Sequence, residues 1–132
     1  MTTKNIFNVL MTCMVLGSMI LLAGCAKGTT EYSDSGMTIK ASPGQTFKIV
    51  LDANHTTGYE WQISIPLDTK IVQFDGTDYK AEDTGRVGSG GKEVWTFKAA
   101  GKGKTRIFFE YIRPWEEGKK PVDTKTFKVE ID

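Results

Sequence analysis

The chain has 132 residues, of which 39% are apolar and 25% are charged, a balance typical of one globular domain. Its 17 Lys and Arg residues nearly balance 16 Asp and Glu residues, and a net charge of +1 argues against a nucleic-acid binder that relies on a basic field. Two Cys and one His are too few for a Cys/His zinc cluster or a disulfide framework. We therefore expect no nucleic acid and no bound metal. His55 is the only histidine available as the base that most acyl-transfer enzymes need, so we also expect no enzyme.

The first element along the chain is an uncharged apolar run over residues 6–23, preceded by Lys4. This pattern is typical of a signal peptide. Leu22-Ala23-Gly24-Cys25 resembles the lipobox of bacterial lipoproteins, where cleavage precedes a cysteine that receives lipid, including palmitate. The alternative is an uncleaved membrane helix, for which the run is shorter than the usual ~20 residues. We predict a lipoprotein signal peptide over residues 1–24 and lipidation of Cys25.

The polar segment that follows, residues 25–36, contains two glycines and no apolar period. Such a segment is typical of a flexible tether. It would hold a domain of residues 37–132 at a bacterial-type membrane in the cell envelope. Ala26 stands where an Asp often signals inner-membrane retention, which favours the outer membrane in a Gram-negative cell.

Alternation of apolar and polar residues predicts an all-β domain. The predicted strands are 46–51, 58–65, 71–74, 77–81, 92–99, 104–112 and 124–131, with a further short run at 37–40. Seven or eight short strands over about 100 residues predict an antiparallel β-sandwich with an immunoglobulin-like outline. Trp61 and Trp95 share the parity of apolar neighbours, so we assign them to the core.

Two glycine-rich stretches partly resemble nucleotide-binding loops and are better explained as turns. Residues 101–105 end like a Walker A loop, but Lys98 stands where that loop needs glycine, and a strand pattern follows. Residues 88–91 do not match the dinucleotide-binding pattern and also run into a strand. Neither stretch predicts a cofactor.

Three loops carry the remaining unusual residues: 52–61, 84–93 and 111–118. Loops after alternate strands of an antiparallel sandwich gather at one end. Counting the predicted strands strictly puts the first loop at the opposite end from the other two. Merging 71–74 with 77–81 into one strand would bring all three loops together, and the sequence pattern leaves both arrangements open.

The three loops resemble the signature loops of chagasin-type inhibitors of papain-like cysteine peptidases, the ICP family. Its motifs N-P-T-T-G-[YF], G-x-G-G and R-P-W-[EQ] match Asn54–Tyr59, Gly88–Gly91 and Arg113–Glu116 in the same order. His55 stands where the family usually has proline, which predicts a less rigid first loop and some loss of affinity. The resemblance covers about Met37 to the C-terminus and implies that all three loops share one edge of the sandwich.

The resemblance implies a reversible, tight-binding inhibitor, monomeric and not an enzyme, that occludes the cleft of a papain-like cysteine peptidase. The residues implied to contact the peptidase are Asn54, Thr56, Thr57, Gly58, Tyr59, Gly88, Ser89, Gly90, Gly91, Arg113, Pro114, Trp115 and Glu116. The slim first loop would sit over the catalytic cysteine. The unshielded backbone of the second loop would pair like a substrate, and Trp115 would be a rigid anchor.

Several alternatives stay open. Trp115 is either a contact residue or a core residue, and Arg113 either binds the peptidase or braces its own loop. A surface-anchored adhesion or ligand-binding sandwich would use the same aromatic loop and bind without loss of peptidase activity. An envelope hydrolase would need His55, otherwise an exposed loop residue, to lie beside a Ser or a carboxylate in a cleft.

Overall fold

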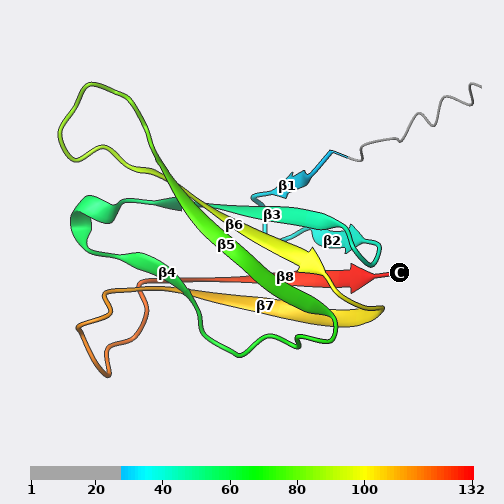
Figure 1. Cartoon of the computed structure of the whole chain (residues 1–132). Coiled ribbons are helices and arrows are strands. Elements are labelled where there is room, and N and C mark those ends of the chain that lie inside the picture. Colours follow the sequence, from blue (N-terminus) through cyan, green and yellow to red (C-terminus); the bar gives the residue numbers. More distant parts are fainter. Residues whose placement is uncertain (1–27) are drawn as a thin grey trace, which may run out of the picture.

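The computed structural model describes residues 28–132, which form eight strands and one short 3-10 helix (Figure 1). The elements are β1 Thr30–Tyr32, β2 Thr38–Ala41, β3 Thr46–Ala53, η1 His55–Thr57, β4 Glu60–Ile63, β5 Val72–Ala81, β6 Gly91–Ala99, β7 Gly103–Ile112 and β8 Asp123–Ile131. The predicted signal peptide at residues 1–24 and the predicted lipid site Cys25 lie outside the described residues. Among residues 28–132, no helix is long and apolar enough to cross a membrane.

The strands form two four-stranded sheets, ordered β1-β3-β6-β5 and β2-β8-β7-β4. The prediction of an all-β sandwich with seven or eight strands is confirmed, and the number is eight. All pairs formed among strands β3 to β8 are antiparallel. The two N-terminal strands depart from that pattern, because β1 pairs in parallel with β3 and β2 pairs in parallel with β8.

The segment predicted to be a flexible tether contains a strand. β1 lies within residues 25–36 and extends the sheet beside β3. Its Tyr32 packs edge-on against Phe47, with ring centroids 6.5 Å apart. A strand of three residues is too short for alternation to reveal it in the sequence. The folded part of the chain therefore begins before residue 37.

β5 unites the two short strands predicted at 71–74 and 77–81. Its pairing with β6 shifts register between Phe74 and Gly76, as in a β-bulge. The bulge interrupts the alternation, which explains why the sequence pattern resembles two strands. Because β5 crosses the sheet only once, the loops after β3, β5 and β7 all lie at one end of the sandwich, on the left of Figure 1.

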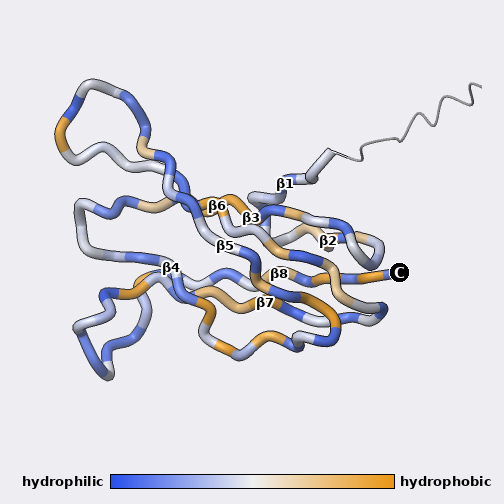
Figure 2. The backbone as a smooth tube through the Cα atoms, viewed as in Figure 1, coloured by the Kyte–Doolittle hydropathy of each residue, from blue (hydrophilic) through white to orange (hydrophobic). Residues whose placement is uncertain are grey.

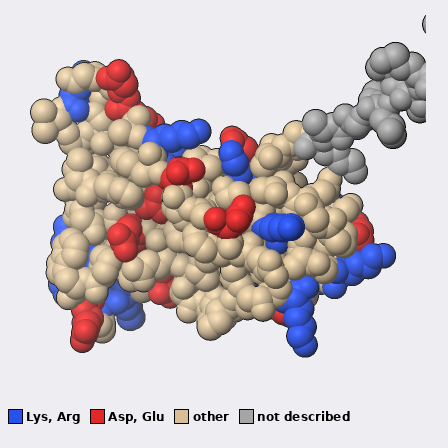
Figure 3. Space-filling view, in the orientation of Figure 1, with Lys and Arg blue, Asp and Glu red and all other residues tan. Residues whose placement is uncertain are grey.

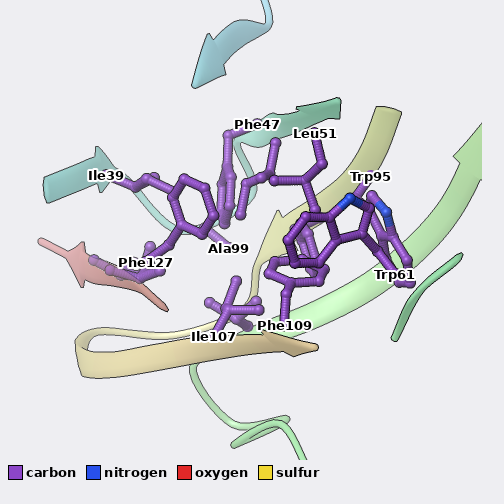
Figure 4. Packing of buried hydrophobic residues seen from close by; sticks show 14 of the residues in the cluster. Ile39, Phe47, Leu51, Trp61, Trp95, Ala99, Ile107, Phe109 and Phe127 are labelled. Atoms are coloured by element: carbon purple, nitrogen blue, oxygen red, sulfur yellow. The ribbon is translucent and has the colours of Figure 1, made fainter. Parts of the chain in front are cut away.

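Aromatic rings fill the core between the sheets (Figure 4). Trp61 and Trp95 are buried, as predicted. Phe109 lies among them, with its ring centroid 5.0 Å from that of Trp95 and 5.9 Å from that of Phe127. Figure 2 shows apolar residues alternating along the strands, whereas the loops at the left-hand end are largely hydrophilic. The core therefore fixes the strand ends, and the strand ends position the loops.

Candidate functional site

Three loops form one end of the molecule, which we call the loop pole (Figure 1). The first loop comprises residues 54–59 after β3, the second comprises residues 82–90 after β5, and the third comprises residues 113–122 after β7. The sequence left open whether these loops share one end. The structure brings them together, as the family resemblance implied.

Asn54 organises the first loop as the N-cap of η1. Its side-chain Oδ1 accepts hydrogen bonds from Thr56 N at 3.1 Å and from Thr56 Oγ1 at 2.6 Å. Thr57 Oγ1 donates to the Asn54 carbonyl at 2.6 Å. Gly58 then ends the turn with a φ of 79°, in the left-handed region that favours glycine. The turn is therefore closed by its own side chains.

Hydrogen bonds join the first loop to both of its neighbours. Asn54 Nδ2 donates to the carbonyl of Gly88 in the second loop at 3.1 Å. Arg113 Nε in the third loop donates to the carbonyl of Thr57 at 3.1 Å. The three loops consequently form one connected surface rather than three independent segments.

The second loop is held by the hydroxyl of Ser89. Its Oγ donates to the Arg86 carbonyl at 2.6 Å and lies 2.5 Å from Thr84 Oγ1. At the base of the loop, the Gly90 carbonyl accepts a hydrogen bond from Glu82 N at 2.9 Å. These contacts give a glycine-rich segment a defined shape.

Gly91 differs from the other predicted contact residues because it is buried at the start of β6. A Cβ at this position would lie 2.5 Å from the Lys80 carbonyl and 2.7 Å from the Tyr79 ring. The glycine is therefore needed for the close approach of β5 to β6. The exposed tip of the second loop carries Val87, whose side chain is fully accessible.

Arg113 braces the loop pole from within. Its guanidinium carbon lies 4.4 Å from the centroid of the Tyr59 ring, a cation–π arrangement. Its Nη1 lies 3.4 Å from Glu116 Oε1, an oxygen that Lys119 Nζ also approaches at 3.3 Å. The sequence left open whether Arg113 binds the peptidase or braces its own loop. Together with the hydrogen bond to the Thr57 carbonyl, these contacts support the bracing role.

Trp115 projects from the third loop after the exposed Pro114. Its side chain is 66% exposed, so the core alternative for this residue is wrong. The edge of the indole ring lies directly over Gly58, and a Cβ on that glycine would collide with the ring. A large apolar ring thus stands beside the slim backbone of the first loop.

His55 is not the simple exposed loop residue that the sequence suggested. Its ring is 42% exposed, but its Nε2 lies 2.8 Å from Oε1 of Glu93, a carboxylate that is 3% exposed. Glu93 also accepts hydrogen bonds from Trp61 N at 3.3 Å and Trp95 Nε1 at 2.9 Å. The hydrolase alternative required a carboxylate beside His55, but this one is buried and engaged in holding structure. Sequence parity could have revealed Glu93, since it shares the inward face of its strand with Trp95.

An exposed ion pair lies beside the His55–Glu93 contact and joins β6 to β3. Lys92 Nζ donates to Asp52 Oδ1 at 2.6 Å, and this hydrogen bond raises the pKa of Lys92 above its usual value. In the described part of the chain, no group of three or more His, Cys, Asp or Glu residues is arranged to hold a metal ion. The loop pole is thus an ordered surface from which the indole of Trp115 projects.

Comparison with known proteins identifies relatives over most of the described chain. Residues 40–131 match the model of the family described as chagasin family peptidase inhibitor I42. Amoebiasin-2 from Entamoeba histolytica is 35% identical over 102 residues, which cover 77% of this chain and 82% of the relative.

Solved structures agree with this match. The crystal structure of the cysteine protease inhibitor EhICP2 from Entamoeba histolytica is 29% identical, with a TM-score of 0.63 and coverage of 79% of this chain and 97% of that chain. The structure of PbICP-C in complex with falcipain-2 is 21% identical, with a TM-score of 0.50 and coverage of 80% and 100%, and it shows a shared fold. The family match includes all three loops of the loop pole, and the chain therefore belongs to the chagasin family of peptidase inhibitors, which inhibit cysteine proteases and are not enzymes.

Proposed function

We propose that the loop pole enters the active-site cleft of a papain-like cysteine peptidase and blocks it reversibly. The observation that carries this proposal is that hydrogen bonds join the three exposed loops. Asn54 bonds to Gly88, and Arg113 bonds to Thr57. Loops that are ordered before binding lose less conformational entropy when they dock, so more of the contact energy remains as affinity. The similar protein PbICP-C was solved in complex with falcipain-2, which fits this class of partner.

The first loop is suited to approach the catalytic thiol without being cleaved. Thr56, Thr57 and Gly58 present small side chains and backbone. The carbonyls of Asn54 and His55 are engaged inside the turn, by Thr57 N at 3.2 Å and by Gly58 N at 3.1 Å. A peptidase cleaves a chain that lies extended in its cleft, whereas this backbone is held in a 3-10 turn. The loop therefore fills the cleft and stays intact.

The flanking loops supply affinity on either side of the first. Gly88 is exposed and Ser89 is half-buried, and their small side chains leave the backbone accessible for pairing with an extended edge of the cleft. Trp115 offers a large, rigid contact of the kind that dominates binding energy at interfaces. One copy supplies all three loops, which could cover one side of a standard interface of ~1,600 Å² in total. We therefore propose that the inhibitor acts as a monomer, which light scattering can test.

The direct experiment is a titration of papain and of a cathepsin-L-like peptidase with the purified protein. We expect activity to fall to zero near one equivalent of inhibitor and to return on dilution. Mass spectrometry of the inhibitor recovered from the complex should show an uncut chain. If papain keeps its activity at a large molar excess, the proposal is wrong. Binding to the peptidase without loss of activity would instead favour the adhesion or ligand-binding alternative.

We also propose that the protein is a lipoprotein anchored through Cys25 in the cell envelope, at the outer membrane of a Gram-negative cell. The support is the apolar run at residues 6–23, the lipobox-like residues before Cys25, and the direction of β1. β1 runs parallel to β3 toward the loop pole, so the described chain enters from the opposite end (Figure 1). Figure 3 shows Lys and Arg side chains at that end of the visible face as well as at the loop pole, and those at the entry end would face anionic lipid headgroups.

This arrangement would present the loop pole away from the membrane. Labelling cells with radioactive palmitate should mark the wild-type protein and leave the Cys25→Ala variant unmarked. The wild-type protein should also sediment with outer-membrane fragments. A labelled Cys25→Ala variant, or a wild-type protein that stays unlabelled, would exclude lipidation at this residue.

A further inference from the structure

We propose that His55 and Glu93 form a positioning device for the first inhibitory loop, and that its hold on the loop strengthens when His55 is protonated. The inference rests on the proposed function, since it concerns how that loop is prepared for the peptidase cleft. It assigns a role to His55, the position at which the family motif given above has proline.

The device is built around a buried carboxylate. Glu93 is 2% exposed, and its two oxygens accept hydrogen bonds from Trp61 N, from Trp95 Nε1 and from the ring of His55. The indole and backbone N–H donors are neutral. His55 is therefore the partner in this cluster that can bring a positive charge to the carboxylate, at 2.8 Å.

The ring of His55 is fixed from a second direction. It stacks on the ring of Tyr79 from β5, with centroids 3.8 Å apart and planes 12° from parallel. His55 is also the first residue of η1, and its carbonyl accepts the hydrogen bond from Gly58 N that closes the turn. Holding the ring against β5 and β6 therefore holds the turn that approaches the catalytic thiol.

In this geometry, protonation of His55 should strengthen its contact with Glu93. The groups that face the imidazole are the Glu93 carboxylate from β6, the Tyr79 phenol ring from β5 and, through Glu93, the Trp61 backbone of β4. The Lys92–Asp52 ion pair occupies the neighbouring register position of β6 and β3. Adding a proton to His55 turns its hydrogen bond to the Glu93 carboxylate into an ion pair, and the added attraction between opposite charges is stronger beside a desolvated carboxylate than in bulk water. Histidines in general change charge between about pH 5 and 8, so the loop should be held more tightly as the solution becomes acidic.

The variant His55→Pro isolates the effect of protonation on the first loop. Asn54 has φ −132° and ψ 95°, an extended conformation that suits a residue before proline. The first position of a helical turn, occupied by His55, also accepts proline. The His55→Pro variant would thus restrict the loop covalently and without any titration.

The first experiment compares inhibition constants of the full chain, purified in detergent, against papain at about pH 5.5 and about pH 7.5. Dividing each constant by that of His55→Pro at the same pH removes the pH dependence of the peptidase. We expect wild-type inhibition to tighten by about fivefold on acidification relative to His55→Pro. His55→Ala should inhibit about tenfold more weakly than wild type at the acidic pH, because the loop must be ordered on binding. The matched control Lys92→Gln, which removes the exposed neighbouring ion pair, should behave as wild type. The proposal would be overturned if the ratio of the wild-type to the His55→Pro inhibition constant did not change with pH. It would also be overturned if His55→Ala inhibited papain as well as wild type.

The second measurement needs no peptidase. His55 is the only histidine in the chain, so its imidazole signals in an NMR spectrum are unambiguous. In the free protein, the backbone order parameters of Thr57 and Gly58 should rise on acidification in step with protonation of His55, and they should not change in His55→Pro. If these order parameters do not follow protonation of His55, the positioning role of His55 and Glu93 is refuted even if the protein inhibits papain. Order that follows it while papain is ignored supports the device and refutes the proposed function.

Discussion

Replacing Gly58 by alanine perturbs the contact between the first and third loops with a single methyl group. Gly58 has a φ of 79°, and its N–H donates to the His55 carbonyl at 3.1 Å. The new Cβ would point into the indole of Trp115, where three ring atoms approach it too closely. The ring must therefore move, or the turn must open.

The expected magnitude follows from these two effects. A left-handed conformation costs an L-residue about 1–2 kcal/mol, which sets the loss of folding stability. Moving Trp115 adds little to that loss, because its side chain is 66% exposed in the free protein. It does remove a rigid aromatic anchor worth about 2–4 kcal/mol of binding energy. Inhibition should therefore weaken by a factor of about 30 to 700, since each 1.4 kcal/mol is about tenfold in affinity.

Gly44 provides the matched control at the opposite end of the sandwich. Its φ is 87°, and a Cβ there would meet open space. Gly44→Ala should lower the free energy of unfolding by the same ~1–2 kcal/mol and leave papain inhibition unchanged. Urea unfolding and inhibition constants measure the two quantities for both variants. The reasoning fails if Gly58→Ala inhibits within about threefold of wild type, or if Gly44→Ala is equally impaired.

Three further substitutions test the binding contribution of Trp115, the bracing role of Arg113 and the packing of the core. Trp115→Ala should weaken papain inhibition by about 2–4 kcal/mol, and a loss below about tenfold with the circular dichroism spectrum unchanged would remove the residue from the anchor role. Arg113→Lys keeps the charge but loses the planar donor to the Thr57 carbonyl; inhibition should fall by about tenfold, and equal inhibition constants would exclude the brace. Phe47→Ala, in the core far from the loops, should lower the free energy of unfolding by about 3–5 kcal/mol without changing the inhibition constant of the folded protein, as paired calorimetry and inhibition assays would show.

Alternation predicted the long strands well, for a physical reason. In β3 and β6, nearly every second side chain is buried against the facing sheet, so the sequence carries the period directly. The method failed where the period is broken or short. The bulge between Phe74 and Gly76 split β5 in the sequence pattern, and β1 is too short to show a period. Merging the two parts of β5 also decided which end of the sandwich each loop occupies.

The sequence located the loop motifs but not the contacts that make them one surface. Asn54 and Gly88 are separated by 34 positions, and Thr57 and Arg113 by 56, so spacing along the chain says nothing about their hydrogen bonds. Whether Arg113 braces its own molecule depends on where the Thr57 carbonyl points. Such contacts arise only after the sheets have set the relative positions of the strand ends.

A column of aromatic rings explains how the hydrophilic first and third loops keep a fixed shape. The Trp61 ring of the core stacks on Tyr111 with centroids 4.9 Å apart, and Tyr111 contacts Tyr59 at 5.4 Å. Tyr59 in turn lies under the guanidinium of Arg113, and the Tyr111 hydroxyl accepts the hydrogen bond from Asn54 N at 2.8 Å. One buried-to-exposed stack thus supports both the first and the third loop. The packing of the sandwich beneath the two loops therefore adds to their own hydrogen bonds in fixing their geometry.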